Sequence, residues 1–234
     1  MGGGASTGRS SGRWALPDET TFLATHAHGA HGAYLSERLL NAGAVTEINS
    51  PAKWLCSANG FATRSDVAIP LTYHKRDDVF VHITPELFKE RITFRDAESN
   101  ELLAVLEMPY IRRLNWVVYA PRPRVASQRP AKYTYDETPL YAWARITKDT
   151  IELATEDGGY ERTFTGKLRP YSLIRGSFGE GHLSSGGGGA LVFSQSTQRL
   201  AVAPGIDPLL MTVYIVVLDC RQLLVNQHDY HGNV

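Results

Sequence analysis

The chain has 234 residues, 43% of them hydrophobic, which is enough to fill the core of one large domain or two small ones. Its 24 lysines and arginines balance its 24 aspartates and glutamates, so no overall charge draws it to nucleic acid or to a membrane. The only cysteines, Cys56 and Cys220, are far apart, which excludes a disulfide framework and a zinc finger and favours a reducing compartment.

The N-terminal residues predict an arm and an extension outside the main fold. Residues 1–17 are rich in Gly and Ser, cannot repay the entropy of ordering, and are expected to be flexible. They contain no apolar signal segment, so we expect no secretory leader. Residues 18–44 form a predicted extension with a short helix at 33–43, where Tyr and Leu have helical spacing and Gly43 is the C-cap.

From residue 45 the pattern changes to short runs typical of β-strands, separated by turn residues. Residues 91–95 and 101–108 predict two strands joined by the polar turn 96–100. The Glu-Asp-Gly-Gly segment at 156–159 predicts another hairpin turn. The main domain, 45–225, is therefore expected to be predominantly antiparallel β.

Two segments of this domain interrupt the strand pattern. Residues 121–132 are rich in Pro and residues 179–189 are rich in Gly. Pro lacks the donor that a strand needs, and Gly weakens a strand interior. We expect both segments to be surface loops.

A nearly continuous apolar run, Leu209 to Leu218, lies close to the C-terminus. It is about half the length of a membrane span, which needs about 20 apolar residues. Asp207 followed by Pro208 is a typical helix start. We therefore predict a core helix at 207–224, apolar on all sides and covered by the strands, followed by a tail at 226–234.

Several local motifs resemble those of one superfamily. "GKLRPYSLIRGSF" (166–178) and "QRLAVAPGID" (198–207) resemble segments of tubby C-terminal domains, and "TFRDAESNELLAVLE" followed by "NWVVY" resembles the LURP-one-related proteins. The direct run from "APGID" into the last helix is similar to the LURP-one-related group and the phospholipid scramblases. The resemblance covers about residues 78–224. It implies a mainly β fold, a closed antiparallel β-barrel that encloses the hydrophobic C-terminal α-helix, in which closure removes exposed edges.

The same resemblance implies a lipid headgroup site. Tubby domains bind phosphoinositides through basic residues on the barrel surface, and the matching positions here are Lys167 and Arg169, to which we add the nearby Arg175. Guanidinium and ammonium groups suit phosphate clusters because they form several charge-assisted hydrogen bonds. The alternative is that these side chains alternate outward on a strand for solubility alone.

The Pro-rich loop carries a second basic set without any acid. Its members are Arg122, Arg124, Arg129 and Lys132. Beside an anionic leaflet each such charge contributes about 1 kcal/mol, so we predict a membrane-facing loop. The alternative is a solvated loop; nucleic acid is disfavoured because no binding motif accompanies these charges.

The start of the chain matches the N-myristoylation pattern. "MGGGAS" exposes Gly2 after removal of Met1 and places Ser6 as the pattern requires. One myristoyl chain binds membranes only marginally, so stable attachment needs a second signal such as a basic patch. The alternative is a chance match in a Gly- and Ser-rich segment.

No motif predicts catalysis, a cofactor or a metal. Histidines gather in two groups, His26, His28 and His31, then His228 and His231. Both groups lie in segments without a buried second shell, so adventitious metal binding is the preferred interpretation. No nucleophile elbow and no P-loop is present.

These observations predict a non-enzymatic, peripheral protein at the cytoplasmic face of a membrane. Its partners would be anionic phospholipids or phosphoinositides, with a protein partner open, and it would act as a tether or sensor. Three alternatives stay open: scramblase-like lipid transfer, a barrel that holds a small apolar ligand, and a protein-interaction module.

Overall fold

The computed structural model describes most of the predicted main domain. The described residues are 34–36, 46–49, 69–72, 79–86, 91–107, 115–172, 177–186, 188–194 and 199–231. The predicted arm at 1–17 lies outside them. So does the predicted short helix, apart from residues 34–36.

Antiparallel strands are the main elements of the described chain. They are β1 (Thr46–Asn49), β2 (Ile69–Thr72), β3 (Val79–Glu86), β4 (Arg91–Asp96), β5 (Leu102–Glu107), β6 (Trp116–Ala120), β7 (Thr134–Tyr135), β8 (Thr138–Pro139), β9 (Tyr141–Ile146), β10 (Thr150–Ala154), β11 (Tyr160–Ser172), β12 (Ser177–Ser185), β13 (Gly188–Ser194) and β14 (Arg199–Val202). Twelve of them form one sheet in the order β1-β14-β13-β12-β11-β10-β9-β6-β5-β4-β3-β2. The prediction of a mainly β, antiparallel fold is confirmed.

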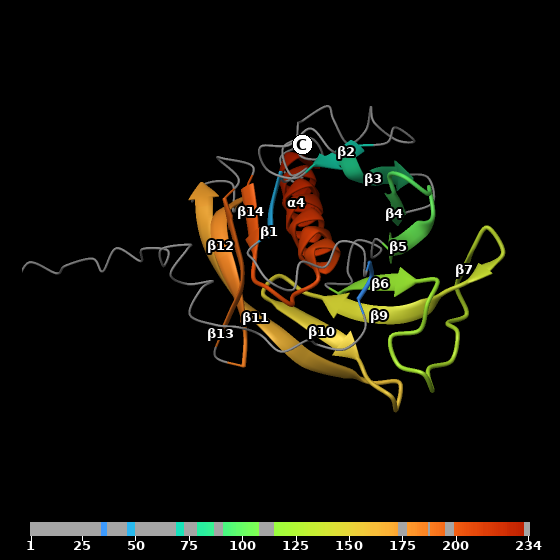
Figure 1. The fold of residues 1–234 in the computed structure, drawn as a ribbon. Coiled ribbons are helices and arrows are strands. Elements are labelled where there is room, and N and C mark those ends of the chain that lie inside the picture. Colours follow the sequence, from blue (N-terminus) through green and yellow to red (C-terminus); the bar gives the residue numbers. More distant parts are fainter. Residues whose placement is uncertain are drawn as a thin grey trace, which may run out of the picture.

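The sheet curls around the C-terminal helix α4, Pro208–His231 (Figure 1). Its two edge strands, β1 and β2, approach each other until Cα atoms lie within 8 Å. Among the described residues, however, no ladder of hydrogen bonds joins these two strands. Hydrogen bonding therefore does not close this part of the sheet into a barrel.

Helix α4 fills the space that the sheet surrounds. Every described side chain from Leu209 to Leu218 is buried, and so is Cys220. Even Thr212 fits this environment, because its hydroxyl donates to the carbonyl of Pro208 at 2.9 Å. The apolar run is therefore a core helix as predicted, and it extends to His231 rather than ending at residue 224.

Within the described residues, no helix combines the length and the apolarity that crossing a bilayer demands.

The two predicted hairpins have the expected turns. The Asp96 carboxylate accepts the backbone N–H groups of Glu98 (2.9 Å) and Ser99 (3.0 Å), so the turn between β4 and β5 is fixed by its own side chain. Between β10 and β11, Gly158 has a φ of +83°, a conformation that glycine adopts without strain. Local turn chemistry was sufficient to place both.

The prediction of a surface loop at 179–189 is wrong, because most of that segment belongs to β12 and β13. Tertiary packing explains Gly181. A Cβ atom added to Gly181 would lie 2.8 Å from ring atoms of Phe193 and 2.9 Å from Leu168. Glycine lets the buried Phe193 ring lie directly against the backbone of β12, and this contact outweighs the low strand propensity of glycine.

A second, smaller apolar cluster lies apart from the helix. It contains Leu102, Val105, Tyr135 and Leu140, with Tyr119 and Tyr133 packed against it. The short β7–β8 hairpin contributes Tyr135 to this cluster. The hairpin thus covers side chains of β5 and β6 that would otherwise be exposed.

Candidate functional site

The 121–132 segment is a loop, as predicted, and side-chain contacts anchor it to β9. The indole Nε1 of Trp143 donates to the carbonyl of Arg122 at 2.5 Å. Within the loop, the backbone N–H of Arg124 donates to the side chain of Gln128 at 3.0 Å, and Gln128 in turn donates to the carbonyl of Ala142. The loop therefore presents its charged side chains from a defined backbone.

Three of the four basic side chains in this loop point into solvent. Arg122, Arg129 and Lys132 are exposed. None of the three forms a side-chain hydrogen bond or ion pair with the described chain. Their positive charges are therefore not neutralised by direct partners, and the loop has the exposed charge that was expected of it.

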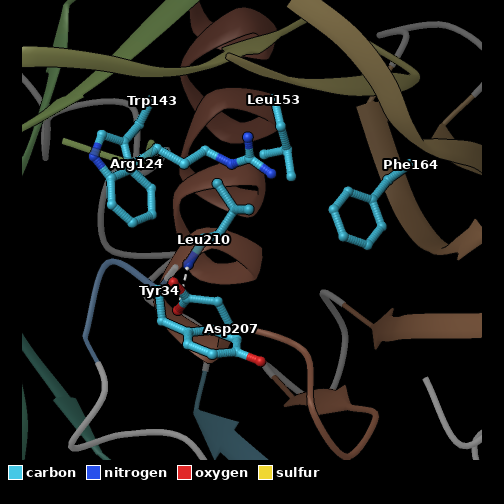
Figure 2. A pocket seen from close by; sticks show the side chains of 7 residues that line it. All are labelled: Tyr34, Arg124, Trp143, Leu153, Phe164, Asp207 and Leu210. Atoms are coloured by element: carbon cyan, nitrogen blue, oxygen red, sulfur yellow. Dashed lines mark hydrogen bonds between the residues drawn. The ribbon is translucent and has the colours of Figure 1, made fainter. Parts of the chain in front are cut away.

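Arg124 is placed differently from the other three. Its guanidinium points into the molecule beside Trp143 and Leu153 (Figure 2) and donates to the carbonyl of Ala154 at the end of β10. Burial lowers the pKa of Arg124, while the carboxylate of Glu161 acts in the opposite direction. This side chain holds the loop to β10 and adds little to the exposed charge.

A small cavity lies between Arg124 and the N-terminus of α4. It is lined by Tyr34, Arg124, Trp143, Leu153, Phe164, Asp207 and Leu210 (Figure 2). Its volume of about 20 Å³ has room for one water molecule. This cavity is far too small for an apolar ligand of the kind considered from the sequence.

Asp207 caps the helix and is fully buried. One carboxylate oxygen accepts the backbone N–H groups of Leu209 (2.8 Å) and Leu210 (3.2 Å), and the other accepts that of Leu35 at 2.6 Å. Burial raises the pKa of Asp207 to about 6, although the three N–H donors act to lower it. The carboxylate joins the segment 34–36 to the N-terminal end of α4. The Tyr34 hydroxyl adds a second link, because it donates to the carbonyl of Gly205 at 3.3 Å.

Lys167, from the predicted headgroup set, is exposed on the outer face of β11. Phe164 and Leu168 point to the opposite face and contact the core. The side chain of Arg169 lies outside the described residues, and its backbone pairs with that of Glu180 in β12. Arg175 lies outside the described residues as well. Of the predicted set, Lys167 alone has a described and exposed charge.

The two basic sets do not meet on one surface. Ala154, which holds Arg124, pairs with Tyr160 at the start of β11. Lys167 lies seven residues further along this strand. At about 3.3 Å per residue, Lys167 is about 23 Å along the strand from Tyr160, the end of β11 near which Arg124 anchors the loop, and this is several times the size of a headgroup phosphate. The loop and the strand are therefore two separate candidate sites.

Sequence reasoning missed a buried polar network beneath the β7–β8 hairpin. Arg91 donates to Glu86 at 2.8 and 2.9 Å, Tyr135 donates to the same carboxylate at 2.9 Å, and the Arg91 guanidinium lies 4.2 Å from the centre of the Tyr135 ring. The hairpin turn has Asp136 and Glu137 at φ values of 46° and 67°, where Asn-Gly or Asp-Gly is usual. Its only signal in the sequence was the alternation Tyr133-Thr134-Tyr135 directly before Asp136.

The remaining sequence predictions concern lipidation and metals. Gly2 and the first histidine group lie outside the described residues, and the side chains of His228 and His231 are likewise not described. In the part of the chain that is described, no three His, Cys, Asp or Glu side chains gather in a way that could hold a metal ion.

Comparisons with known proteins inform the fold. No family model and no curated protein matches the chain. A crystal structure of a protein from Arabidopsis thaliana is similar with a TM-score of 0.50 and 11% sequence identity, over 81% of this chain and 98% of that one. At this identity the likeness concerns the fold alone.

Proposed function

We propose that this protein is a peripheral membrane protein that binds anionic phospholipids, phosphoinositides among them, from the cytoplasmic side. The observation that carries the proposal is the set of three exposed cations, Arg122, Arg129 and Lys132, on one anchored loop that contains no acid. The motifs that resemble tubby and LURP-one-related proteins support the same assignment. The proposal also includes the closed β-barrel that this resemblance implies. The close approach of the edge strands β1 and β2 supports this part of the proposal.

Charge arithmetic sets the strength of this interaction. Three charges at about 1 kcal/mol each give about 3 kcal/mol, or a little over a hundredfold in affinity. A myristoyl chain on Gly2 would add an association constant of about 10⁴ M⁻¹. The two together reach about 10⁶ M⁻¹, whereas either alone gives weak attachment that salt readily reverses.

Lys167 supplies a different kind of contact in this proposal. On the outer face of β11 it is positioned to reach a multiply phosphorylated headgroup, with Arg169 and Arg175 as its candidate partners. Glu180 opposite Arg169 opposes this role, because a carboxylate beside the site repels phosphate. We therefore assign general attraction to the loop and headgroup selection to the strand. Such a protein acts as a tether or sensor and needs no catalysis.

A flotation assay with lipid vesicles tests the proposal. The triple variant Arg122→Gln, Arg129→Gln, Lys132→Gln should lose most of its binding to vesicles that contain phosphatidylglycerol. The control, Lys148→Gln with Arg162→Gln, removes two exposed charges from outside the loop and should bind like the wild type. Equal binding of the triple variant and the wild type would show that the loop does not face the membrane.

The wild-type protein itself provides a second check. Intact mass should show an acyl group on Gly2, and Gly2→Ala should release the protein from membranes. A wild-type chain that has no acyl group and ignores anionic vesicles at low salt contradicts the membrane proposal. The protein would then be better described as a protein-interaction module.

A further inference from the structure

The surface beside the basic loop is hollowed against the turn between β10 and β11. The hollow has a volume of about 370 Å³, within the range of about 300–1,000 Å³ that is usual for small-molecule sites. Residues 127–129 and 131 form its loop wall and residues 156–158 form its turn wall. Ala142 of β9 also lines the hollow.

Both walls are held in place before any ligand arrives. Gln128 fixes the loop wall through its hydrogen bonds to the Arg124 N–H and the Ala142 carbonyl. In the turn wall, the N–H of Thr155 donates to Gly159 at 3.0 Å and the N–H of Gly158 donates to Thr155 at 3.1 Å. A preformed site loses less entropy on binding than a flexible one does.

The two walls carry opposite charges. The loop wall offers the Arg129 guanidinium and the Ser127 hydroxyl, and the turn wall offers the carboxylates of Glu156 and Asp157. Neither Arg129 nor Glu156 forms a side-chain hydrogen bond or ion pair with the described chain. Hydrogen bonds from the Thr155 hydroxyl and the Gly159 N–H lower the pKa of Asp157, so the Asp157 carboxylate stays ionised at neutral pH.

This arrangement selects against ligands of a single charge. A simple anion would meet the carboxylates of the turn wall, and a simple cation would meet Arg129. A ligand that carries both charges satisfies both walls, because a guanidinium binds phosphate through two parallel hydrogen bonds and carboxylates accept hydrogen bonds from an ammonium group. Among the residues that the structure describes, no aromatic side chain lines the hollow, and a quaternary ammonium group is best bound by aromatic rings.

We propose that this hollow binds a zwitterion with a phosphate and a primary ammonium group, as in the headgroup of ethanolamine phospholipids. Arg129 and Ser127 bind the phosphate, and Glu156 with Asp157 binds the ammonium. The lipid source of this headgroup rests on the proposed function, in which Arg122 and Lys132 bring the loop to a membrane. A free phosphoethanolamine would be bound by the same chemistry.

The first experiment uses soluble headgroups and is independent of any membrane. Calorimetric titration at low salt should show that glycerophosphoethanolamine binds at least about tenfold more tightly than glycerophosphocholine, since one charge-assisted interaction corresponds to about that factor. Arg129→Gln and Glu156→Gln should each weaken glycerophosphoethanolamine binding about tenfold, whereas Lys148→Gln, an exposed charge at the other end of β10, should not. Equal affinity for the two headgroups, or an unchanged affinity in Glu156→Gln, would overturn the proposal and leave an ordinary solvated hollow.

The second experiment identifies the source of the ligand. Vesicles with a constant phosphatidylglycerol content should bind more wild-type protein when phosphatidylcholine is replaced by phosphatidylethanolamine. Glu156→Gln should lose this increase while it still binds the anionic vesicles, because it removes an acid and leaves the basic loop intact. If the protein binds vesicles without dependence on ethanolamine lipid and does not bind the soluble headgroup in the titration, the proposed binding in the hollow is refuted. The proposed function would then still stand. If the protein binds the soluble headgroup but not the vesicles, the proposed function is refuted. The hollow would then be a binding site for the free zwitterion.

Discussion

Replacing Asp207 by asparagine removes a fully buried carboxylate from the cap of α4 with almost no change in side-chain shape. The amide has one oxygen, which the N–H groups of Leu209 and Leu210 occupy, so the N–H of Leu35 would face the amide nitrogen instead of an acceptor. This unpaired N–H costs about 1–3 kcal/mol at every pH. The charge itself adds a second effect that depends on pH.

The pKa of Asp207 sets the size and sign of that second effect. Burial raises it from 3.8 to about 6, a difference of about 2 units and therefore about 3 kcal/mol. A raised pKa in the folded state means that the native protein binds this proton more tightly than the unfolded chain does. The stabilisation is fully present below pH of about 4 and is lost as the pH rises through about 6.

The assay is urea unfolding of the wild type and Asp207→Asn at steps between pH 4 and pH 7. The free energy of unfolding of the wild type minus that of the variant should fall by about 2.4 kcal/mol across this range, because the other titrating groups cancel in the difference. A difference that stays constant or grows with pH would refute the reasoning. It would show that the three N–H donors hold the carboxylate ionised despite its burial.

Two further substitutions test the packing of the sheet. Gly181→Ala should lower the free energy of unfolding by about 1–3 kcal/mol, because the new methyl group would overlap the Phe193 ring. In thermal melts, the added substitution Phe193→Leu should recover part of this loss. A single variant as stable as the wild type would contradict the close contact. Glu137→Gly should raise the free energy of unfolding by about 1 kcal/mol, because φ at this position is 67° and glycine adopts such a value without the penalty of a Cβ atom. The control is Glu101→Gly at an exposed position where φ is not positive, and this change should not stabilise the protein.

Sequence reasoning succeeded where the chemistry is local. Asp207 and Pro208 marked the start of α4 because a capping side chain acts on backbone groups only two or three residues away. Asp96 likewise fixes the turn in which it lies. The end of the helix was placed seven residues too early, because no comparable signal marks it in the sequence.

The same reasoning failed where the partner is distant in sequence. The glycines of β12 predict a loop by themselves, and only the tertiary structure shows that the Phe193 ring lies against Gly181, where a Cβ atom would overlap it. Arg124 cannot be distinguished from Arg122 by its sequence surroundings, yet its guanidinium lies in the interior and donates to Ala154. Whether a charged side chain faces solvent depends on where the carbonyls of other strands are.

The sequence by itself therefore determined the helix that fills the sheet, the antiparallel hairpins and the presence of a basic loop, because hydrophobic periodicity, capping and turn chemistry act over a few residues. Tertiary structure alone decided which charges are exposed, that the loop and Lys167 are two surfaces rather than one, and that an acidic turn lies across a hollow from Arg129. It also decided the hydrogen bond from the Leu35 N–H to the Asp207 carboxylate, two residues that are 172 positions apart. Contacts of this kind exist only after the sheet has curled around the helix, and no local pattern encodes them.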